Sequence, residues 1–425
     1  MINGIIKYMK NRVSGIWWLS DKPDNKIAGD LLVEDRKLEL TGTFEGLKSG
    51  VYDGSPKLVK TVQQTTIQGV ARNGGNKYTL EYFADPVSFT MHSYKADTYR
   101  LGDIFIGEHI DKIENLAFDR YYVEFPYLYE WLDDGVITIR TTFKDNPLRR
   151  ESTIIVVNDV KTTKIYEDQN IILTLVSSVG RMPILPVEKN INIEQKCVLG
   201  IEVKKGRLSL TEALSVIQHF QRFLIIATGR SLEPVDIKVK TDSARDYTTL
   251  LPYRFQKKYY KDINTHDMNF TFEDIKTECK GLFTKWFADK DKYADIFDLF
   301  SALRSDVPKM LENQFKDITG AIEGYVRIKQ NDLEISLDKA VKTLNEALPE
   351  NDRPFSISDR NKIRVTRNKL SHVAIKEADA PYVMSHEDMY FTYERLLALF
   401  EYSVLKNLGL SQEKLRKFYN KRKSW

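Results

Sequence analysis

The stretch 209–229, SLTEALSVIQHFQRFLIIATG, is where the hydrophobic pattern of the chain changes its period. Its large apolar residues recur at spacings of three and four, which predicts a helix with one apolar stripe. That stripe comprises Leu214, Ile217, Phe220, Leu224 and Ile225. Gly229 suits the C-terminal end of the helix, because glycine readily adopts the positive φ found there. We therefore expect a helix near 209–229 that closes the first domain of the chain.

Before this helix, the chain consists largely of short segments typical of β-strands. They are rich in Val, Ile, Thr, Tyr and Phe, and turn residues bound many of them. They include LLVEDRKLEL, TTIQGVA, KYTLEYF, GVITIRTTF, STIIVVNDV, NIILTLVSSV and NINIEQKCVLGIEV. The sequence NGGN at 73–76 predicts a hairpin turn, since Gly and Asn accept positive φ. Residues 1–245 are thus expected to form a β-rich antiparallel domain, either a sandwich or a barrel-like fold, with the helix at its end.

After this helix, a mixed connection at about 231–270 leads into helical sequence that continues to the C-terminus. Segments such as KYADIFDLFSALRS and KMLENQFKDITGAIEGYVRIK repeat apolar residues at three and four. Pro354 precedes a helix that we expect Ser358 to cap, and Gly409 follows the last long helix. The predicted fold class is α+β, with a β-rich antiparallel N-terminal domain followed by an all-α helical bundle over 270–425.

The composition is that of an ordinary globular protein, with 42% hydrophobic and 29% charged residues among 425. The formal net charge of +4 does not indicate a nucleic-acid binder, so any basic footprint has to be local. Cys197 and Cys279 lie far apart, which argues against a disulfide framework and against a cysteine-based zinc site. We see neither a signal peptide nor an apolar run of about 18 residues, and so expect a cytoplasmic protein without a membrane span.

One short segment, RNKLSH at 367–372, combines residue types suited to cleaving RNA. Asn368 and His372 are four residues apart and share a face of the expected helix, and the long side chain of Arg367 can reach the same place. When a ribose 2′-hydroxyl attacks the adjacent phosphate, the reaction needs a proton acceptor and donor near neutral pH, which histidine offers. It also needs a fixed positive fork against the phosphoryl oxygens, which arginine provides better than lysine.

The spacing of this segment has limited specificity by itself. A bare R-x-x-x-x-H pair is weak evidence, and an Asn directly after the Arg makes it more specific. The alternative is that Arg367 and Lys369 are solvated and that His372 is an ordinary histidine at a helix end. One chain supplies only one His and one Arg to the active site. We therefore expect two chains to meet across a two-fold axis and to supply two of each residue.

Two parts of the sequence resemble a known family. RNKLSH matches the R-N-x-x-x-H signature of HEPN domains, an all-helical superfamily of dimeric ribonucleases common in toxin and antiphage systems. The stretch SGIWWLSDKPDNKIAGDLLVEDRKLELTGTF at 14–44 looks like the opening of the N-terminal domain of ApeA-type proteins, where G-x-W-W precedes I-x-G-x-L and L-x-L-x-G-x-F. The positions that carry this likeness are Gly15, Trp17, Trp18, Ile27, Gly29, Leu31, Leu38, Leu40, Gly42 and Phe44.

The resemblance covers nearly the whole chain and implies a function. It makes 1–245 an ApeA-like domain and 270–425 a HEPN-like bundle, and it implies an abortive-infection antiphage protein that cuts cellular RNA, with tRNA as the expected substrate. It implies that Arg367, Asn368 and His372 are catalytic. A HEPN bundle often carries a further polar residue on an earlier helix, and Glu323 in DITGAIEGYV suits that place. If Glu323 is buried it needs a partner such as Arg367 or His372, and otherwise it lies on the surface of an amphipathic helix.

The C-terminal stretch KLRKFYNKRKSW mixes basic residues with Phe418, Tyr419 and Trp425. Such a mixture can hold a single strand by phosphate contact and stacking, although a frayed solvated tail is the plainer interpretation. The residues expected to contact RNA are Lys369, Arg364, Lys421, Arg422 and Lys423.

Three functional hypotheses remain at this point. The first is a homodimeric or higher-oligomeric HEPN endoribonuclease that needs no metal or cofactor, with a phage-derived trigger sensed by the N-terminal domain. The second is a HEPN scaffold that has lost activity and binds RNA or a protein. The third gives the N-terminal domain its own enzymology, although no spacing of its carboxylates singles out a site. The histidines show no H-x-x-x-H pair, and neither a Walker loop nor a G-x-S-x-G elbow occurs.

Overall fold

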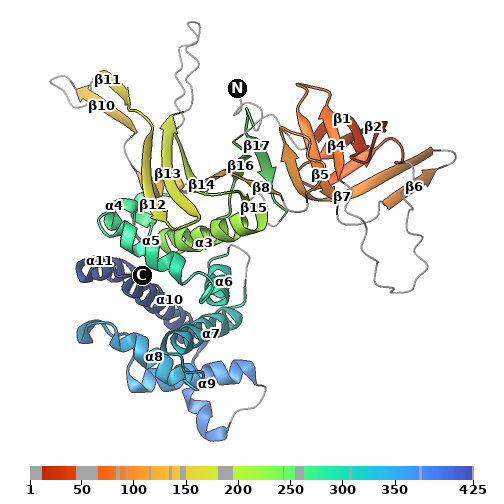
Figure 1. The fold of residues 1–425 in the computed structure, drawn as a ribbon. Coiled ribbons are helices and arrows are strands. Elements are labelled where there is room, and N and C mark those ends of the chain that lie inside the picture. Colours follow the sequence, from red (N-terminus) through yellow and green to blue (C-terminus); the bar gives the residue numbers. More distant parts are fainter. Residues whose placement is uncertain are drawn as a thin grey trace.

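The computed structural model describes most of the chain. The described residues are 12–44, 66–82, 87–91, 94–113, 116–133, 136–143, 150–179, 195–242, 244–253, 263–305, 309–372 and 376–423. Their fold is α+β, as predicted, with antiparallel β-structure in the N-terminal part and helices in the C-terminal part (Figure 1).

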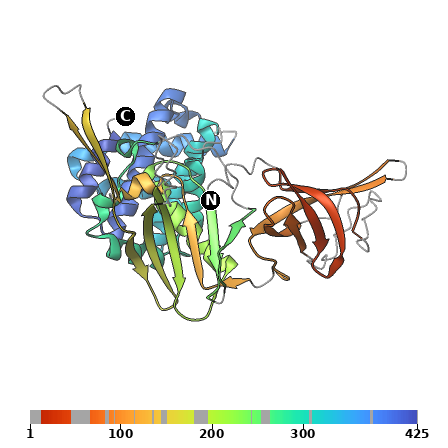
Figure 2. The same cartoon turned by 90° about the horizontal axis from the view of Figure 1, so that it is seen from above.

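The first strands close into a small antiparallel barrel, which stands apart from the helices in Figure 2. The hydrogen-bonded order is β7-β3-β2-β1-β4-β5, and the last strand, β5, also pairs with the first, β7, which closes the ring. The barrel strands are β1 (Arg12–Leu19), β2 (Lys22–Leu32), β3 (Lys37–Leu40), β4 (Ile67–Ala71), β5 (Lys77–Tyr82) and β7 (Tyr94–Ile106). A further strand, β6 (Val87–Met91), pairs with β7. The predicted turn between β4 and β5 is confirmed, since Gly74 and Gly75 have φ of 87° and 65°.

Trp17 is at the centre of the barrel core and is fully buried. Its Nε1 donates a hydrogen bond of 3.0 Å to the carbonyl oxygen of Gly29. A Cβ atom at Gly69 would lie 2.1 Å from Cε3 of Trp17, so only glycine lets β4 approach the indole ring. Trp18 is also largely buried, with Nε1 bonded to Oε1 of Gln68. Both tryptophans therefore serve the packing of the barrel.

A second antiparallel layer continues from the barrel through β17, which pairs with β7. Its order is β17-β16-β9-β14-β13-β12, and together with the barrel it forms a 13-stranded sheet. Its strands are β9 (Arg120–Glu124), β12 (Lys161–Glu167), β13 (Ile171–Val179), β14 (Gln195–Val203), β16 (Asp236–Lys240) and β17 (Thr248–Leu251). Smaller elements are β8 (Ala117–Phe118), α2 (Leu128–Leu132), β10 (Ile137–Phe143), β11 (Arg150–Val157) and β15 (Leu208–Ser209).

The helix predicted at 209–229 is α3 (Leu210–Thr228). Ser209 and Glu212 form a reciprocal capping box at its start, and Gly229 with φ of 69° ends it. Phe220 and Phe223 are buried between the second layer and the C-terminal helices, where Phe223 contacts the rings of Phe283 and Trp286. Because both faces of α3 are covered, it joins the sheet to the helices that follow (Figure 1).

The C-terminal part is a bundle of helices around α10 (His386–Leu408). The other elements are η1 (Thr265–Asp267), α4 (Phe272–Ile275), α5 (Cys279–Ala288), α6 (Ala294–Leu303), α7 (Leu311–Gln330), α8 (Leu337–Glu346), η2 (Glu350–Asp352), α9 (Ile357–Ser371), η3 (Glu377–Tyr382) and α11 (Gln412–Lys423). Gly409 ends α10 with φ of 93°, as predicted. None of the helices in the described part of the chain is long and apolar enough to cross a membrane.

The hydrophobic cores show how these parts are held together. One core fills the barrel, and a second runs without interruption from the second sheet layer through α3 into the helical bundle. From the connection that we predicted at 231–270, this second core includes Leu232, Ile237, Val239, Leu250, Met268 and Phe270. The described part of this connection contains β16, β17 and η1.

Candidate active site

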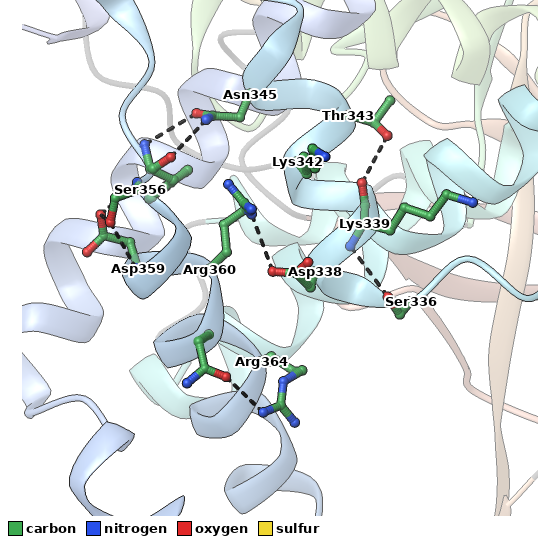
Figure 3. A network of polar contacts seen from close by, with 12 residues as sticks. Ser336, Asp338, Lys339, Lys342, Thr343, Asn345, Ser356, Asp359, Arg360 and Arg364 are labelled. Atoms are coloured by element: carbon green, nitrogen blue, oxygen red, sulfur yellow. Dashed lines mark hydrogen bonds and ion pairs between the residues drawn. The ribbon is translucent and has the colours of Figure 1, made fainter.

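Helix α9 carries the RNKLSH segment, and a polar network fixes its first turns (Figure 3). We predicted that Ser358 caps this helix, and that was wrong. Ser356 is the cap, because its side chain accepts from Asp359 N–H while the carboxylate of Asp359 accepts from Ser356 N–H. Ser358 is already inside the helix. One turn later Arg360 Nε donates to Asp338 Oδ1 on α8 at 3.3 Å, which ties α9 to α8.

Arg367 lies near the end of α9 and is joined to α7 by Glu323. Its Nη2 atom donates to Oε2 of Glu323 at 2.5 Å. The other carboxylate oxygen, Oε1, accepts from Nη2 of Arg327 at 2.9 Å. Arg327 is four residues after Glu323 on the same helix, and its Nε is held by the carbonyl oxygen of Ile335 at 2.8 Å. The carboxylate thus lies between two guanidinium groups, each bound to a different oxygen.

Burial and charge of this cluster determine what it can bind. The side chain of Glu323 is 10% exposed, whereas the side chains of Arg327 and Arg367 are 35% and 29% exposed. A buried carboxylate requires a positively charged partner. Glu323 has two such partners, Arg327 and Arg367, so the three side chains together carry a net charge of +1. The cluster therefore presents a net positive, partly exposed face, in which the arginine side chains are held by fixed contacts.

His372 follows the last residue of α9. Its backbone is extended, with φ of −131° and ψ of 138°, and its N–H donates to the carbonyl oxygen of Asn368 at 2.9 Å. The residue is exposed, and within the described part of the chain its imidazole has no hydrogen-bond partner. The side chain of Asn368 is turned to Arg367, whose Nη1 donates to Oδ1 at 3.4 Å. Asn368 is therefore placed to orient Arg367 more than His372.

The end of α9 is held against the start of α10. The N–H of Met384 donates to the Oγ1 atom of Thr366 at 3.0 Å, and Thr366 is itself buried. Arg367 therefore follows a residue that is fixed in the core, while His372 faces solvent five residues later. A fixed cation and an accessible imidazole on one helix end are the elements needed to bind a phosphate and to move a proton beside it.

Comparison with known families gives two matches along the chain. The ApeA N-terminal domain 1 family matches residues 12–286, and the Apea-like HEPN family matches residues 253–414. The first match alone covers more than half of the chain. The chain belongs to the ApeA family. No curated protein and no solved structure was found to match it.

The Apea-like HEPN match contains the whole cluster, including Glu323, Arg327, Arg367 and His372. Membership in this family supports a nuclease role in antiphage defence. Within the described residues, no group of three or more His, Cys, Asp or Glu side chains is placed to hold a metal ion.

The basic residues that we expected to contact RNA fall into two groups. Lys369 is exposed on the HEPN helix α9, and Arg364 is half-buried with its Nη2 bonded to Oδ1 of Asn361 at 2.8 Å (Figure 3). Both lie within the same two turns as Arg367. They remain suitable for phosphate contact beside the candidate site.

The second group is on α11, and the structure gives its residues other partners. Arg422 Nε lies 3.3 Å from Oε2 of the fully buried Glu401, and Lys421 Nζ donates to the carbonyl oxygen of Met268. Phe418 and Tyr419 are buried, so they cannot stack on bases. α11 (Gln412–Lys423) is thus a helix that packs against α10 and not a frayed tail, and RNA contact by its basic residues stays a prediction. The side chain of Lys423 lies outside the described residues.

Arg327 is the residue of this site that the sequence analysis did not identify. Its spacing to Glu323 is the signal that was available, because Glu and Arg four residues apart on a helix can pair. Such pairs are common on exposed helix faces, and only the burial of Glu323 distinguishes this one.

Proposed function

We propose that this chain is a HEPN endoribonuclease that cleaves cellular RNA without a metal ion in antiphage defence. Arg367 binds the scissile phosphate, His372 transfers protons, and Glu323 positions Arg367. Asn368 supports the guanidinium of Arg367 from the neighbouring position. The observation that carries the proposal is the contact of 2.5 Å between Arg367 and Glu323, which holds a partly exposed guanidinium near the end of the helix that the exposed His372 follows.

The reaction is an internal transesterification. His372 removes the proton from the ribose 2′-hydroxyl, and the 2′-oxygen forms a bond to phosphorus. The bond between phosphorus and the 5′-oxygen breaks, and this oxygen takes a proton from the partner subunit's His372. The products are a 2′,3′-cyclic phosphate and a 5′-hydroxyl. Arg367 stabilises the negative charge that develops on the phosphoryl oxygens.

The homodimer is part of this proposal. Each chain contributes one exposed histidine to the reaction, which needs both a base and an acid, so two copies give each role its own residue. We propose tRNA as the RNA substrate and a phage-derived trigger that the N-terminal domain senses. A nuclease that is always active would kill its host, so we expect the protein to have little ribonuclease activity until the trigger is present.

The rival function is a HEPN scaffold that binds RNA or protein without cutting it. The structure offers one observation in its favour, since Glu323 already neutralises part of the charge of Arg367. Two guanidinium groups against one carboxylate still leave a net positive face, which suits RNA binding in both functions, and the exposed imidazole of His372 favours the enzyme.

The test compares purified wild type with His372→Ala on total RNA and on tRNA in excess chelator. His386→Ala is the matched control, because His386 is also exposed and begins the next helix. We expect chelator-resistant cuts with wild type and with His386→Ala, and none with His372→Ala. Where no protein cuts, extracts of phage-infected cells are added to supply the trigger. Equal cutting by wild type and His372→Ala contradicts the proposal.

A further inference from the structure

A cleft of about 620 Å³ opens where the end of α3 meets helices α10 and α11. Its walls come from both family regions. Gly229 and Arg230 follow α3, while Tyr390, Arg395 and Arg422 belong to the HEPN bundle. A ligand of the size of one nucleotide fits such a volume. The cleft shares no lining residue with the cluster around Arg367.

The floor of the cleft is a buried ionic network. Glu401 is fully buried, and its Oε1 accepts a hydrogen bond from Arg304. Its Oε2 lies 3.3 Å from Nε of Arg422, an ion pair in which neither atom forms a hydrogen bond within the described residues. Nη2 of Arg422 lies 3.7 Å from Oε2 of Glu394, which is too long for a hydrogen bond. This Nη2 atom and Nε of Arg304 are buried, and they meet no hydrogen-bond acceptor in the described part of the chain. Buried guanidinium donors that lack acceptors favour an anion.

The rim of the cleft adds unpaired charge. Arg230 and Arg395 are exposed, and neither forms an ion pair with another described residue. The carboxylates of the cleft and its floor, Asp267, Glu394 and Glu401, are one fewer than the four lining arginines. Those arginines are Arg230, Arg304, Arg395 and Arg422.

Aromatic side chains lie on the same rim. Tyr390 and Phe391 are 50% and 49% exposed, and their ring centroids are 5.7 Å apart. Exposed rings beside arginine side chains offer a base a surface for stacking. The charged floor makes an apolar ligand or an apolar helix a poor fit, because the guanidinium groups would be buried without acceptors.

We propose that this cleft binds a nucleoside phosphate. Its phosphate contacts the arginines, and its base stacks on Tyr390 or Phe391 at the rim. The ligand is either a free nucleotide or one nucleotide of a bound RNA strand, since both present the same groups. Because the walls come from α3 and from α10 and α11, the bound ligand contacts the ApeA N-terminal and HEPN regions together. The proposal does not depend on catalysis by His372.

The test measures binding to the full-length protein by titration calorimetry. The probes are the four ribonucleoside 5′-monophosphates, inorganic phosphate and a single-stranded hexaribonucleotide. The variants are Arg395→Gln and Tyr390→Ala, and Arg416→Gln is the control because Arg416 is exposed on α11 and does not line the cleft. Thermal unfolding shows that each variant is folded.

We expect a monophosphate or the hexamer to bind, and each rim variant to weaken that binding about tenfold, as for the loss of one charged contact or one stacked base. Arg416→Gln should bind as wild type does. Binding of monophosphates identifies a free nucleotide, and binding of the hexamer alone identifies RNA. Phosphate that binds as tightly as nucleotides overturns the role of the base. The proposal is also overturned if none of the probes binds, or if Arg395→Gln binds as tightly as wild type. It is overturned as well if wild type binds no nucleotide while Tyr390→Ala changes the oligomeric mass, because the cleft would then be a contact between protein chains.

Discussion

Nη2 of Arg367 on α9 lies 2.5 Å from Oε2 of Glu323 on α7, and this contact joins the helix of the RNKLSH segment to an earlier helix of the bundle. The two residues are 44 positions apart, so their contact depends on how the helices pack. Because Glu323 is buried and Arg367 is not, the carboxylate determines where the guanidinium is held.

Replacing Glu323 by Gln should lower the rate of RNA cleavage. The amide keeps the shape but places N–H groups beside one guanidinium, so Arg367 loses its fixed position. We expect a fall in kcat of about tenfold or more and a loss of about 2 kcal/mol in the free energy of unfolding. Single-turnover cleavage and urea unfolding measure the two effects. Glu334→Gln, an exposed residue after α7, is the control, and a Glu323→Gln enzyme with normal kcat would show that Glu323 does not position Arg367.

Arg327→Gln should weaken RNA binding and reduce its dependence on salt. If Arg327 presents a second positive charge to RNA, the logarithm of the RNA-binding constant falls less steeply with the logarithm of the salt concentration once this charge is removed. For single-stranded RNA the slope should become less negative by about 0.7. Arg327→Lys keeps the charge and should keep the slope. Binding is measured by fluorescence anisotropy in the His372→Ala background, so that RNA is not cut. An unchanged slope in Arg327→Gln would limit Arg327 to its contacts with Glu323 and Ile335.

Arg422→Ala should lower stability, whereas Lys369→Ala should not. Removing Arg422 leaves Glu401 with one partner in the buried interior, which costs about 3 kcal/mol. Lys369 is exposed, so its replacement should weaken RNA binding without a change in Tm. Thermal unfolding and anisotropy are measured on both variants. An Arg422→Ala protein as stable as wild type would show that Arg422 is not needed to neutralise Glu401.

Lowering the pH should destabilise the packing of α3 on α5 through His219. Burial above all lowers the pKa of His219 to about 3, and its Nε2 is hydrogen-bonded to the carbonyl oxygen of Trp286 at 2.8 Å. The unfolded chain takes up a proton below about pH 6.5 while the folded chain does not, so stability is lost as the pH falls from 6.5 towards 3. At pH 5 the loss from this residue is about 2 kcal/mol.

Urea unfolding of wild type and His219→Gln at pH 7.5 and pH 5 measures this loss. The difference in stability between the two proteins should shift in favour of the variant at pH 5. His266→Gln serves as the control, because His266 is exposed. An identical pH dependence of wild type and His219→Gln would rule His219 out as the titrating group.

Sequence patterns predicted correctly those elements that depend on residues close together in the sequence. The stripe of α3, the turn at Gly74 and Gly75, and the end of α10 at Gly409 all follow from spacing or from positive φ, and the structure confirms them. The pairing of β5 with β7 that closes the barrel passes over β6, the strand between them in sequence, and alternation within a strand does not specify such a partner. The cap at Ser356 instead of Ser358 shows the usual uncertainty of helix ends.

In the candidate site, too, features that depend on neighbouring residues were predictable, and features that depend on packing were not. Arg367 and His372 belong to one short segment and were recognisable by their spacing, whereas Arg327 depends on the burial of Glu323. The basic C-terminal stretch looked like an RNA-binding tail because its charges are visible in the sequence. Its partners Glu401 and Glu394 lie on α10, and only the packing of α11 brings them together.

The most direct test of the ribonuclease maps RNA ends in phage-challenged cells that express wild type or His372→Ala. We predict new ends during infection with wild type, as 2′,3′-cyclic phosphates paired with 5′-hydroxyls, together with protection of the culture. Both should be absent with His372→Ala at equal protein level. The same ends and the same protection with His372→Ala would contradict the account, because His372 would then have no part in the chemistry.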